Sequence, residues 1–217
     1  MLNIFFVFIF SISVFYLLKE AFNRKKAAEM AKDAVYPLKE EEFSSILVPN
    51  EWKEMKHLSK TAKSYQFVMW GTAAAIILLS ILLFLVISTN WLASYSLNVA
   101  YLFFVIIFSI KHQGNLFILE KGLIINGKFY SSQEIQSYHV EQIIRWHSLY
   151  GLHSRVNNGF KLTFKLKKKM FQPNYMVVEK LEHLEKILAL LEEKEIPCSK
   201  KNEQFRCRTI GDNQNKA

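Results

Sequence analysis

The sequence predicts a membrane protein with three transmembrane α-helices followed by an α+β domain of antiparallel strands and one terminal helix. Three windows of the 217-residue chain contain no Asp, Glu, Lys or Arg: residues 2–18, 67–88 and 91–110. Uncharged apolar runs of about 18 residues or more are long enough to cross a bilayer. After residue 114 the pattern changes to short strand-like runs separated by Gly and Asn, and then to one amphipathic helical pattern. This distribution is not that of a soluble single-domain protein or of a disulfide-rich chain.

The first two windows have different strengths. Residues 67–88 are the clearest span, because 22 helical residues reach about 33 Å. Residues 2–18 also fit a signal peptide in length, but a signal peptide has its bases before the apolar stretch. Here Lys19 and three further bases follow the stretch, which favours an uncleaved anchor. We therefore expect residues 1–18 to form the first transmembrane helix.

The third window is the weakest of the three. Ser94, Ser96 and Asn98 lie in the first half of residues 91–110, and only the second half is continuously apolar. With Trp91 at the headgroup level the window is long enough to span. A buried or re-entrant segment stays open as the alternative.

The bases that flank the windows predict the orientation. Residues 19–66 contain ten Lys and Arg, the connection between the second and third windows contains none, and Lys111 follows the third window directly. Because bases beside a span stay on the cytoplasmic side, we expect a multi-pass protein of the cell membrane with its amino terminus outside. Residues 19–66 and everything after residue 110 are then cytoplasmic. If the third window does not cross, the carboxyl-terminal half moves to the other side.

Residues 19–66 are predicted to form a cytoplasmic helical segment in two pieces. The first piece is rich in Ala, Lys and Glu and ends before Pro37, which disfavours helix at the preceding residue. The second begins at Asn50, a residue type that caps helices, and runs into the second window. Its lysines either rest on an anionic leaflet or act only as positive-inside determinants, and both interpretations remain open.

Residues 111–197 are predicted to form a small β-domain with a C-terminal helix, and residues 198–217 a flexible tail. Strands are expected at 115–120, 123–126 and 128–132, with one to three more before the turn at Asn157. The most regular strand begins at Phe160, where apolar residues alternate with Lys and Thr. The terminal helix should cover the sheet with the four leucines Leu181, Leu184, Leu188 and Leu191.

This β-domain resembles a known family. Glu120-Lys-Gly-Leu, the aliphatic pair Ile124 and Ile125, Gly127 and then Phe-Tyr-Ser-Ser-Gln-Glu-Ile carry the resemblance. They are similar to the bacterial pleckstrin-homology-like domains of small membrane proteins of unknown function, although Ser132 stands where that pattern has Trp. The resemblance covers residues 115–195. It implies a curved, barrel-like sheet of seven antiparallel strands capped by the helix, and it supplies no reaction and no ligand.

No catalytic, cofactor or metal site is predicted, and the chain is not expected to be an enzyme. It has no phosphate-binding Gly-rich loop, no Gly-x-Ser-x-Gly turn and no His-Glu-x-x-His pair. His147 and His153 have no third ligand at a metal-binding spacing. Cys198 and Cys207 are expected to be unpaired thiols, because they follow the domain placed in the cytoplasm.

The one candidate binding site is basic. In a domain tethered to the inner leaflet, a basic face can bind anionic lipid headgroups, and the alternative is an ordinary solvated face. Nucleic acid is not expected as a partner, because no aromatic residues interleave the lysines. The candidate contacts lie on the regular strand and after the first window: Lys161, Lys165, Lys167, Lys168, Lys169, Arg24, Lys25 and Lys26.

Two classes of function follow from these patterns. In the first, an integral membrane protein carries a cytoplasmic interaction or sensing domain that binds a protein partner or anionic lipid headgroups. In the alternative, the chain is an accessory subunit whose transmembrane helices contact a membrane-protein partner or a second copy. The small residues Gly71, Ala73, Ala74 and Ala75 favour this alternative slightly, because they permit close helix approach.

Overall fold

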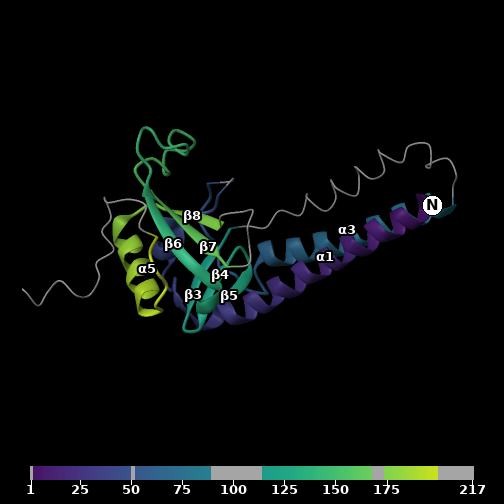
Figure 1. The fold of residues 1–217 in the computed structure, drawn as a ribbon, viewed down its shortest axis with the longest axis horizontal. Helices are drawn as coiled ribbons and strands as arrows, with labels where there is room; N and C mark the ends of the chain where they lie inside the picture. Colours follow the sequence, from purple (N-terminus) through teal and green to yellow (C-terminus); the bar gives the residue numbers. More distant parts are fainter. Residues whose placement is uncertain (1, 50–51, 89–113, 168–173, 200–217) are drawn as a thin grey trace, which may run out of the picture. The chain divides into compact units, whose positions relative to one another are not determined.

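The computed structural model describes residues 2–49, 52–88, 114–167 and 174–199 (Figure 1). The chain divides into two units. The helical unit comprises residues 1–32 and 58–113, and the β-unit comprises residues 33–57 and 114–217. The chain therefore passes between the units three times, and each unit is described by itself below.

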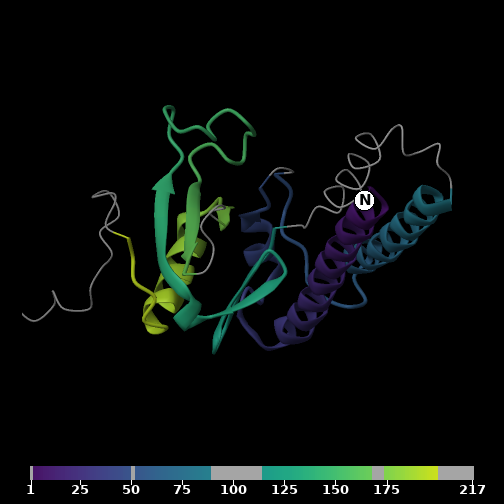
Figure 2. The same cartoon turned by 45° about the vertical axis from the view of Figure 1, so that its right-hand side comes forward.

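The helical unit is built on two long helices that lie side by side, α1 (Leu2–Met30) and α3 (Lys63–Ser88) (Figures 1 and 2). Lys60, just before α3, donates a hydrogen bond to Glu29 at the end of α1, so the two helices run antiparallel. Leu17, Ala75 and Leu79 are buried between them. The packing therefore uses only one stripe of each helix.

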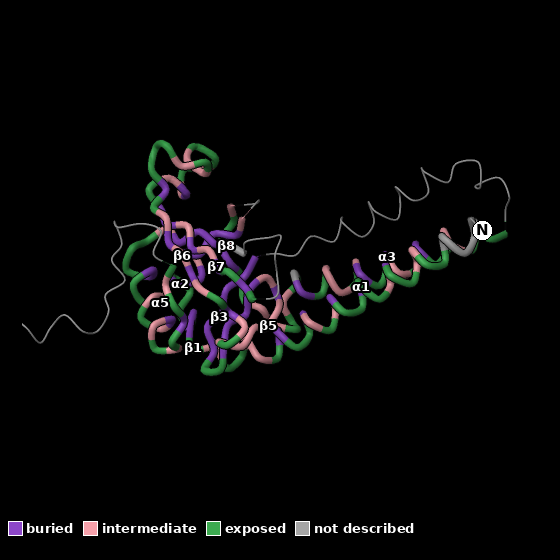
Figure 3. Tube along the Cα trace, viewed as in Figure 1, coloured by how far each residue is buried: buried purple, intermediate pink, exposed green. Residues whose placement is uncertain are grey.

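The outer faces of these helices are apolar as well. Many side chains along both helices are exposed (Figure 3). A helix pair that is hydrophobic on its inner and outer faces is typical of a protein surrounded by lipid or by further protein. The exposed aromatic residues include Phe8, Phe15, Phe22, Phe67, Trp70 and Phe84.

One helix among the described residues is long and apolar enough to cross a membrane. The stretch Tyr65–Leu85 has a mean hydropathy of 2.4, and only 17% of its most apolar window is buried. It overlaps the second predicted span. The first window lies within α1, although the side chains of residues 2–6 are not described, and residues 91–110 lie outside the described residues.

The β-unit contains two four-stranded antiparallel sheets, which confirms the α+β expectation (Figure 2). The first sheet has the order β1-β3-β4-β5 and the second the order β2-β8-β7-β6. The first comprises β1 (Ala34–Tyr36), β3 (Leu116–Leu119), β4 (Gly122–Ile125) and β5 (Lys128–Ser131). The second comprises β2 (Ile46–Leu47), β8 (Asn174–Val178), β7 (Phe160–Leu166) and β6 (Ile135–Gln142).

The alternation predicted for the strand at Phe160 is present in β7. Its Phe and Leu side chains are buried, and its Lys and Thr side chains lie on the other face. The terminal helix α5 (Leu181–Glu193) buries Leu184, Ile187 and Leu191, whereas Leu181 is exposed and Leu188 is half-buried. The predicted apolar face of this helix was therefore wrong at Leu181, and the buried stripe also includes Ile187.

The largest departure from the sequence prediction concerns residues 33–57. These residues were expected to be helical or to connect helices, but they belong to the β-unit. β1 pairs with β3, and β2 pairs with β8, with Ile46 opposite Val178 and Leu47 opposite Val177. The short helix α2 (Glu40–Ser45) lies between them. Asn50 lies outside the described residues, and residues 52–62 contain no helix.

The physical reason for this departure is burial. Ile46, Leu47, Val48 and Met55 are buried in the β-unit, where they cover apolar surface at a sheet edge. Differences in helix propensity amount to only about 0.5 kcal/mol per residue. The burial gained by long-range strand pairing outweighs them.

The start of the predicted tail is also ordered. The backbone N–H of Tyr138 on β6 donates to the carbonyl of Pro197 at 3.0 Å, and the N–H of Ser199 donates to the carbonyl of Tyr138 at 2.8 Å. Cys198, between them, is disulfide-bonded, which contradicts the expected unpaired thiol. Cys207 and the rest of the tail from residue 200 lie outside the described residues.

Gly122 provides a test of the first sheet. A Cβ at this position would lie 2.1 Å from the carbonyl oxygen of Tyr130 and 2.9 Å from Cα of Ser131, both of them backbone atoms of the neighbouring strand. We therefore expect Gly122→Ala to lower the free energy of unfolding by about 3 kcal/mol. Urea unfolding of the full chain in detergent, followed by circular dichroism of the β signal, measures this loss.

Gly151→Ala is the matched control. Gly151 has φ of +84° and open space around its Cβ position, so the substitution costs only backbone strain of about 1 kcal/mol. Equal losses for the two variants would contradict the packing of β4 against β5.

Candidate binding face on the second sheet

The predicted basic face lies on the outer side of the second sheet, opposite its core. The register of β6 and β7 places Glu141 opposite Lys161 and Ser137 opposite Lys165. Tyr175 lies on β8 beside Thr163. The face is therefore not purely basic, because an acidic residue lies opposite Lys161 at one end of it.

Glu141 is the centre of a polar network. Lys161 Nζ donates to Glu141 Oε2 at 3.2 Å, and His147 Nε2 lies 3.4 Å from the same oxygen. His139 Nε2 lies 3.3 Å from Oε1. Burial acts to raise the pKa of Glu141, but the hydrogen bonds from these three side chains outweigh it and hold the pKa below its ordinary value.

The network also fixes the orientation of two of its partners, His147 and Lys161. His147 Nδ1 accepts a hydrogen bond from the backbone N–H of Leu149 at 3.1 Å, so Nε2 carries the proton that points at Glu141. Lys161 Nζ lies 5.4 Å from the ring centroid of Tyr175, a cation–π contact. Lys161 is therefore held by a carboxylate and a ring.

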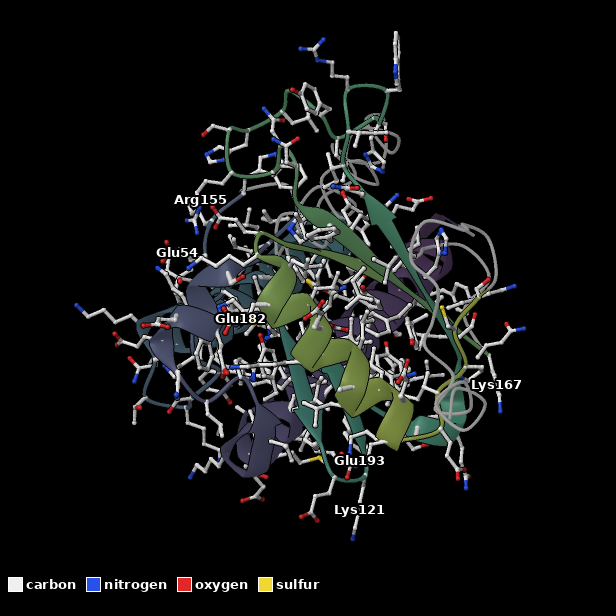
Figure 4. All side chains as sticks on the ribbon, turned by 90° about the vertical axis from the view of Figure 1, so that its left-hand side faces the viewer. Glu54, Lys121, Arg155, Lys167, Glu182 and Glu193 are labelled. Carbon is white, nitrogen blue, oxygen red and sulfur yellow. The ribbon has the colours of Figure 1, made fainter. Side chains whose placement is uncertain are left out.

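The other lysines predicted to contact headgroups lie farther along β7 or outside the described residues. Lys165 and Lys167 are exposed and have no ion-pair partner among the described residues (Figure 4 labels Lys167). Lys168 and Lys169 lie outside the described residues. Among the described residues of the second sheet, the predicted contacts that stay open are therefore those at the Lys165 end of β7.

Arg24, Lys25 and Lys26 belong to the helical unit. Lys25 and Lys26 are exposed on α1, but Arg24 is buried. Burial lowers the pKa of Arg24, against the opposing influence of Glu20 and Tyr65. Arg24 is therefore engaged within the helical unit and is not a surface contact for headgroups.

The connection between β6 and β7, residues 143–159, covers part of this face. Strands were predicted here, but the segment forms a series of turns. Ile143 and Val156 from this loop are buried against Leu47 and Val177, with Trp52 and Tyr150 packed around them. A satellite core of this kind is common under a long loop. It ties the β6–β7 loop to the outer side of the sheet.

Arg155 fastens the same loop to three other segments. Its Nη1 donates to Glu54 Oε1 at 2.7 Å, and its Nη2 donates to Glu179 Oε2 at 2.6 Å (Figure 4). Nη2 also donates to the backbone carbonyl of Ser44 at 2.8 Å. The hydrogen bond with Glu179 is the main reason that the pKa of Arg155 is raised. Sequence reasoning missed this clamp, because a single Arg in a turn-rich segment gives no signal.

The polar groups on this face of the sheet mostly contact one another. Among residues 2–49, 52–88, 114–167 and 174–199, no group of three or more His, Cys, Asp or Glu is arranged to hold a metal ion. The Glu141 network uses its polar atoms on one another, and the open lysines stand at the other end of the strand. What remains available on this sheet is the open lysine end and the surface of the β6–β7 loop.

Arg155 gives a direct test of the clamp. Arg155→Lys keeps the charge but cannot bridge Glu54, Glu179 and Ser44 together. We expect a loss of about 2 kcal/mol in the free energy of unfolding, with faster amide exchange in the β6–β7 loop. Arg145→Lys in the same loop is the control, because Arg145 is exposed, and it should change stability by less than about 0.5 kcal/mol. Equal effects of the two substitutions would contradict the clamp.

The lowered pKa of Glu141 predicts that the free energy of unfolding depends on pH. Its pKa is lower in the folded chain than the ordinary 4.5, so its contribution to stability is complete above that value and is lost as the pH falls through the folded pKa. We expect the stability difference between wild type and Glu141→Gln to be largest at neutral pH and to shrink below about pH 4.5.

Urea midpoints at a series of pH values measure this difference. Glu182→Gln is the control, since Glu182 is an exposed residue of α5 outside the network (Figure 4), and it should follow the wild-type profile. A constant difference between wild type and Glu141→Gln across the series would show that the hydrogen bonds from Lys161, His147 and His139 do not lower the pKa of Glu141.

Comparison with known proteins adds no family to this description. No protein-family model matches the chain, and no curated protein and no solved structure matches it. The resemblance of residues 115–195 to pleckstrin-homology-like domains therefore stays a prediction from the sequence.

Proposed function

We propose that this chain is an integral membrane protein in which the helical unit is the anchor and the β-unit is a cytoplasmic interaction or sensing module. The observation that carries the proposal is the distribution of apolar surface. α1 and α3 expose large aromatic and aliphatic side chains in addition to those that they bury against each other. In water such a surface is unfavourable, whereas in hydrocarbon it is not.

Strand pairing supports an arrangement with three spans. β1 and β2 precede α3, yet they pair with β3 and β8, which follow residue 113. Both ends of the segment 58–113 therefore belong on the same side of a membrane. If α3 crosses, the chain has to return before β3, and this favours a crossing by the window at 91–110. If the first window, in α1, also crosses, the amino terminus lies on the side opposite the β-unit.

The direction of insertion rests on charge. The bases that follow the first window favour a cytoplasmic β-unit. The disulfide at Cys198 points the other way, because disulfides persist mainly in oxidising compartments. The density of bases beside the spans is the stronger argument, since it applies at each boundary. The redox state of Cys198 in the cell is an independent check.

The module is proposed to bind a protein partner or anionic lipid headgroups. Lys165 and Lys167 favour headgroups, because they are exposed on one face without an acidic partner among the described residues. Each basic residue near an anionic leaflet contributes about 1 kcal/mol. Lys161 adds little, since Glu141 already neutralises it.

A second candidate function is an accessory subunit held by its helices. Ala75 is buried against α1, whereas Ala73 and Ala74 are exposed on the same helix. Small exposed residues on a span allow a helix of another protein, or of a second copy, to approach closely.

Accessibility of single cysteines tests the membrane arrangement. In a chain with Cys198→Ser and Cys207→Ser, we would introduce Leu38→Cys, Glu182→Cys or Asn90→Cys. The first two positions are exposed on the β-unit, and the third lies in the connection between the second and third windows, which the predicted orientation places outside. We expect a membrane-impermeant thiol reagent on intact cells to label only the cysteine at position 90, and to label all three after lysis.

The pattern of labelling separates the parts of the proposal. Labelling at positions 38 and 182 without lysis would reverse the orientation. Labelling at only one of these two positions would contradict the shared side of the two halves of the β-unit. Release of the protein from membranes by carbonate at high pH would contradict the anchor itself.

A further inference from the structure

The β6–β7 loop presents an apolar surface that no described residue of the β-unit covers. Trp146 is 92% exposed, Leu152 is 55% exposed and Ile144 is 45% exposed. The loop stands out beyond the ends of β6 and β7 (Figure 1). A Trp this exposed is unusual on a soluble surface, because burying its ring would remove a large apolar area from water.

The loop that exposes Trp146 is ordered by hydrogen bonds. Ile143 donates to the carbonyl of Gly159 at 2.8 Å, and Asn158 donates back to the carbonyl of Ile143 at 3.0 Å, which closes the base of the loop. Within the loop, the N–H of Gly151 donates to Asn157 Oδ1 at 2.8 Å. Arg155 ties the loop to Glu54 and Glu179 outside it. A binding surface that is fixed in advance loses little conformational entropy when it docks.

The charge of the loop indicates what it docks onto. Residues 143–159 contain Arg145 and Arg155 but no Asp or Glu. Arg155 is used by the clamp, whereas Arg145 is exposed directly beside Trp146 and has no ion-pair partner among the described residues. A Trp ring suits the boundary between headgroups and acyl chains, and a neighbouring Arg can reach lipid phosphates. This combination is complementary to an anionic bilayer surface.

We propose that the β6–β7 loop docks onto an anionic bilayer by inserting Trp146 at the interface while Arg145 pairs with lipid phosphates. The inference rests on the proposed function, because the anchor supplies the bilayer. The chain passes between the two units three times, so the loop is held near the membrane at a high effective concentration. A contact too weak to recruit a free domain is then sufficient.

Fluorescence of the full chain in lipid vesicles tests the docking. The probe is a vesicle with brominated acyl chains, made either of phosphatidylcholine alone or with phosphatidylglycerol added. The difference between wild type and Trp146→Ala isolates the emission of Trp146. We expect this emission to be quenched and shifted to shorter wavelength in the anionic vesicles. Arg145→Gln should reduce the ratio of docked to undocked loop about fivefold.

Trp70 serves as the internal reference, because it lies on the candidate span Tyr65–Leu85. The difference between wild type and Trp70→Phe should show quenching in both lipid compositions. Quenched Trp70 with unquenched Trp146 in anionic vesicles would overturn the docking proposal and leave the anchor intact. Unquenched Trp70 would overturn the anchor, and the docking proposal with it.

Two further measurements complete the test. Trp146→Ala should keep the wild-type melting temperature, because the side chain it removes is almost fully exposed. If that variant unfolds, Leu152→Ser replaces it, with a loss of Trp146 quenching expected. Acrylamide quenching compares the chain in native membranes with the purified chain in vesicles that contain no other protein. Protection of Trp146 only in native membranes would assign the loop to a protein partner and overturn the lipid proposal.

Discussion

The pairing of two very short strands with sheets built far along the chain is the constraint on which the rest of the structure depends. β1 has three residues and β2 has two, yet each completes a four-stranded sheet at the edge of β3 or β8. An open edge would invite association with other chains. Closing a loop this long costs only slightly more than closing a short one, because the entropy grows with the logarithm of length. The segment 58–113 can therefore leave the β-unit and return to it.

The same edge supports the features that bind. Ser44, just before β2, provides the carbonyl oxygen that accepts a hydrogen bond from Arg155. Leu47, within β2, is part of the small core under the β6–β7 loop. The position of the loop thus depends on residues about a hundred positions earlier in the chain. Changes near β2 are transmitted to the loop by direct contact. The position of the loop that carries Trp146 therefore depends on the pairing of β2 at the sheet edge.

The sequence alone predicts the features that have a local period or composition. The apolar stretch in α3 follows from composition, and the two faces of β7 follow from strict alternation. β1 and β2 could not be predicted, since strands of three and two residues have no measurable period. Arg155 and its partners could not be predicted either, because they lie 24, 101 and 111 positions apart. The tertiary fold, and not spacing in sequence, brings them together.

The charges on the second sheet show why a count of bases was only a partial guide. Five lysines on and after one strand suggested a uniform basic face, but the register sets Glu141 against the first of them. Opposite charges directly across a strand pair stabilise the sheet and are lost as a binding surface. Among the described residues of the second sheet and its loop, the bases without an acidic partner are then Lys165, Lys167 and Arg145. Since the Glu141 network anchors His147 from the loop, the acidic residue that removes one lysine from binding also holds in place the loop that carries Arg145.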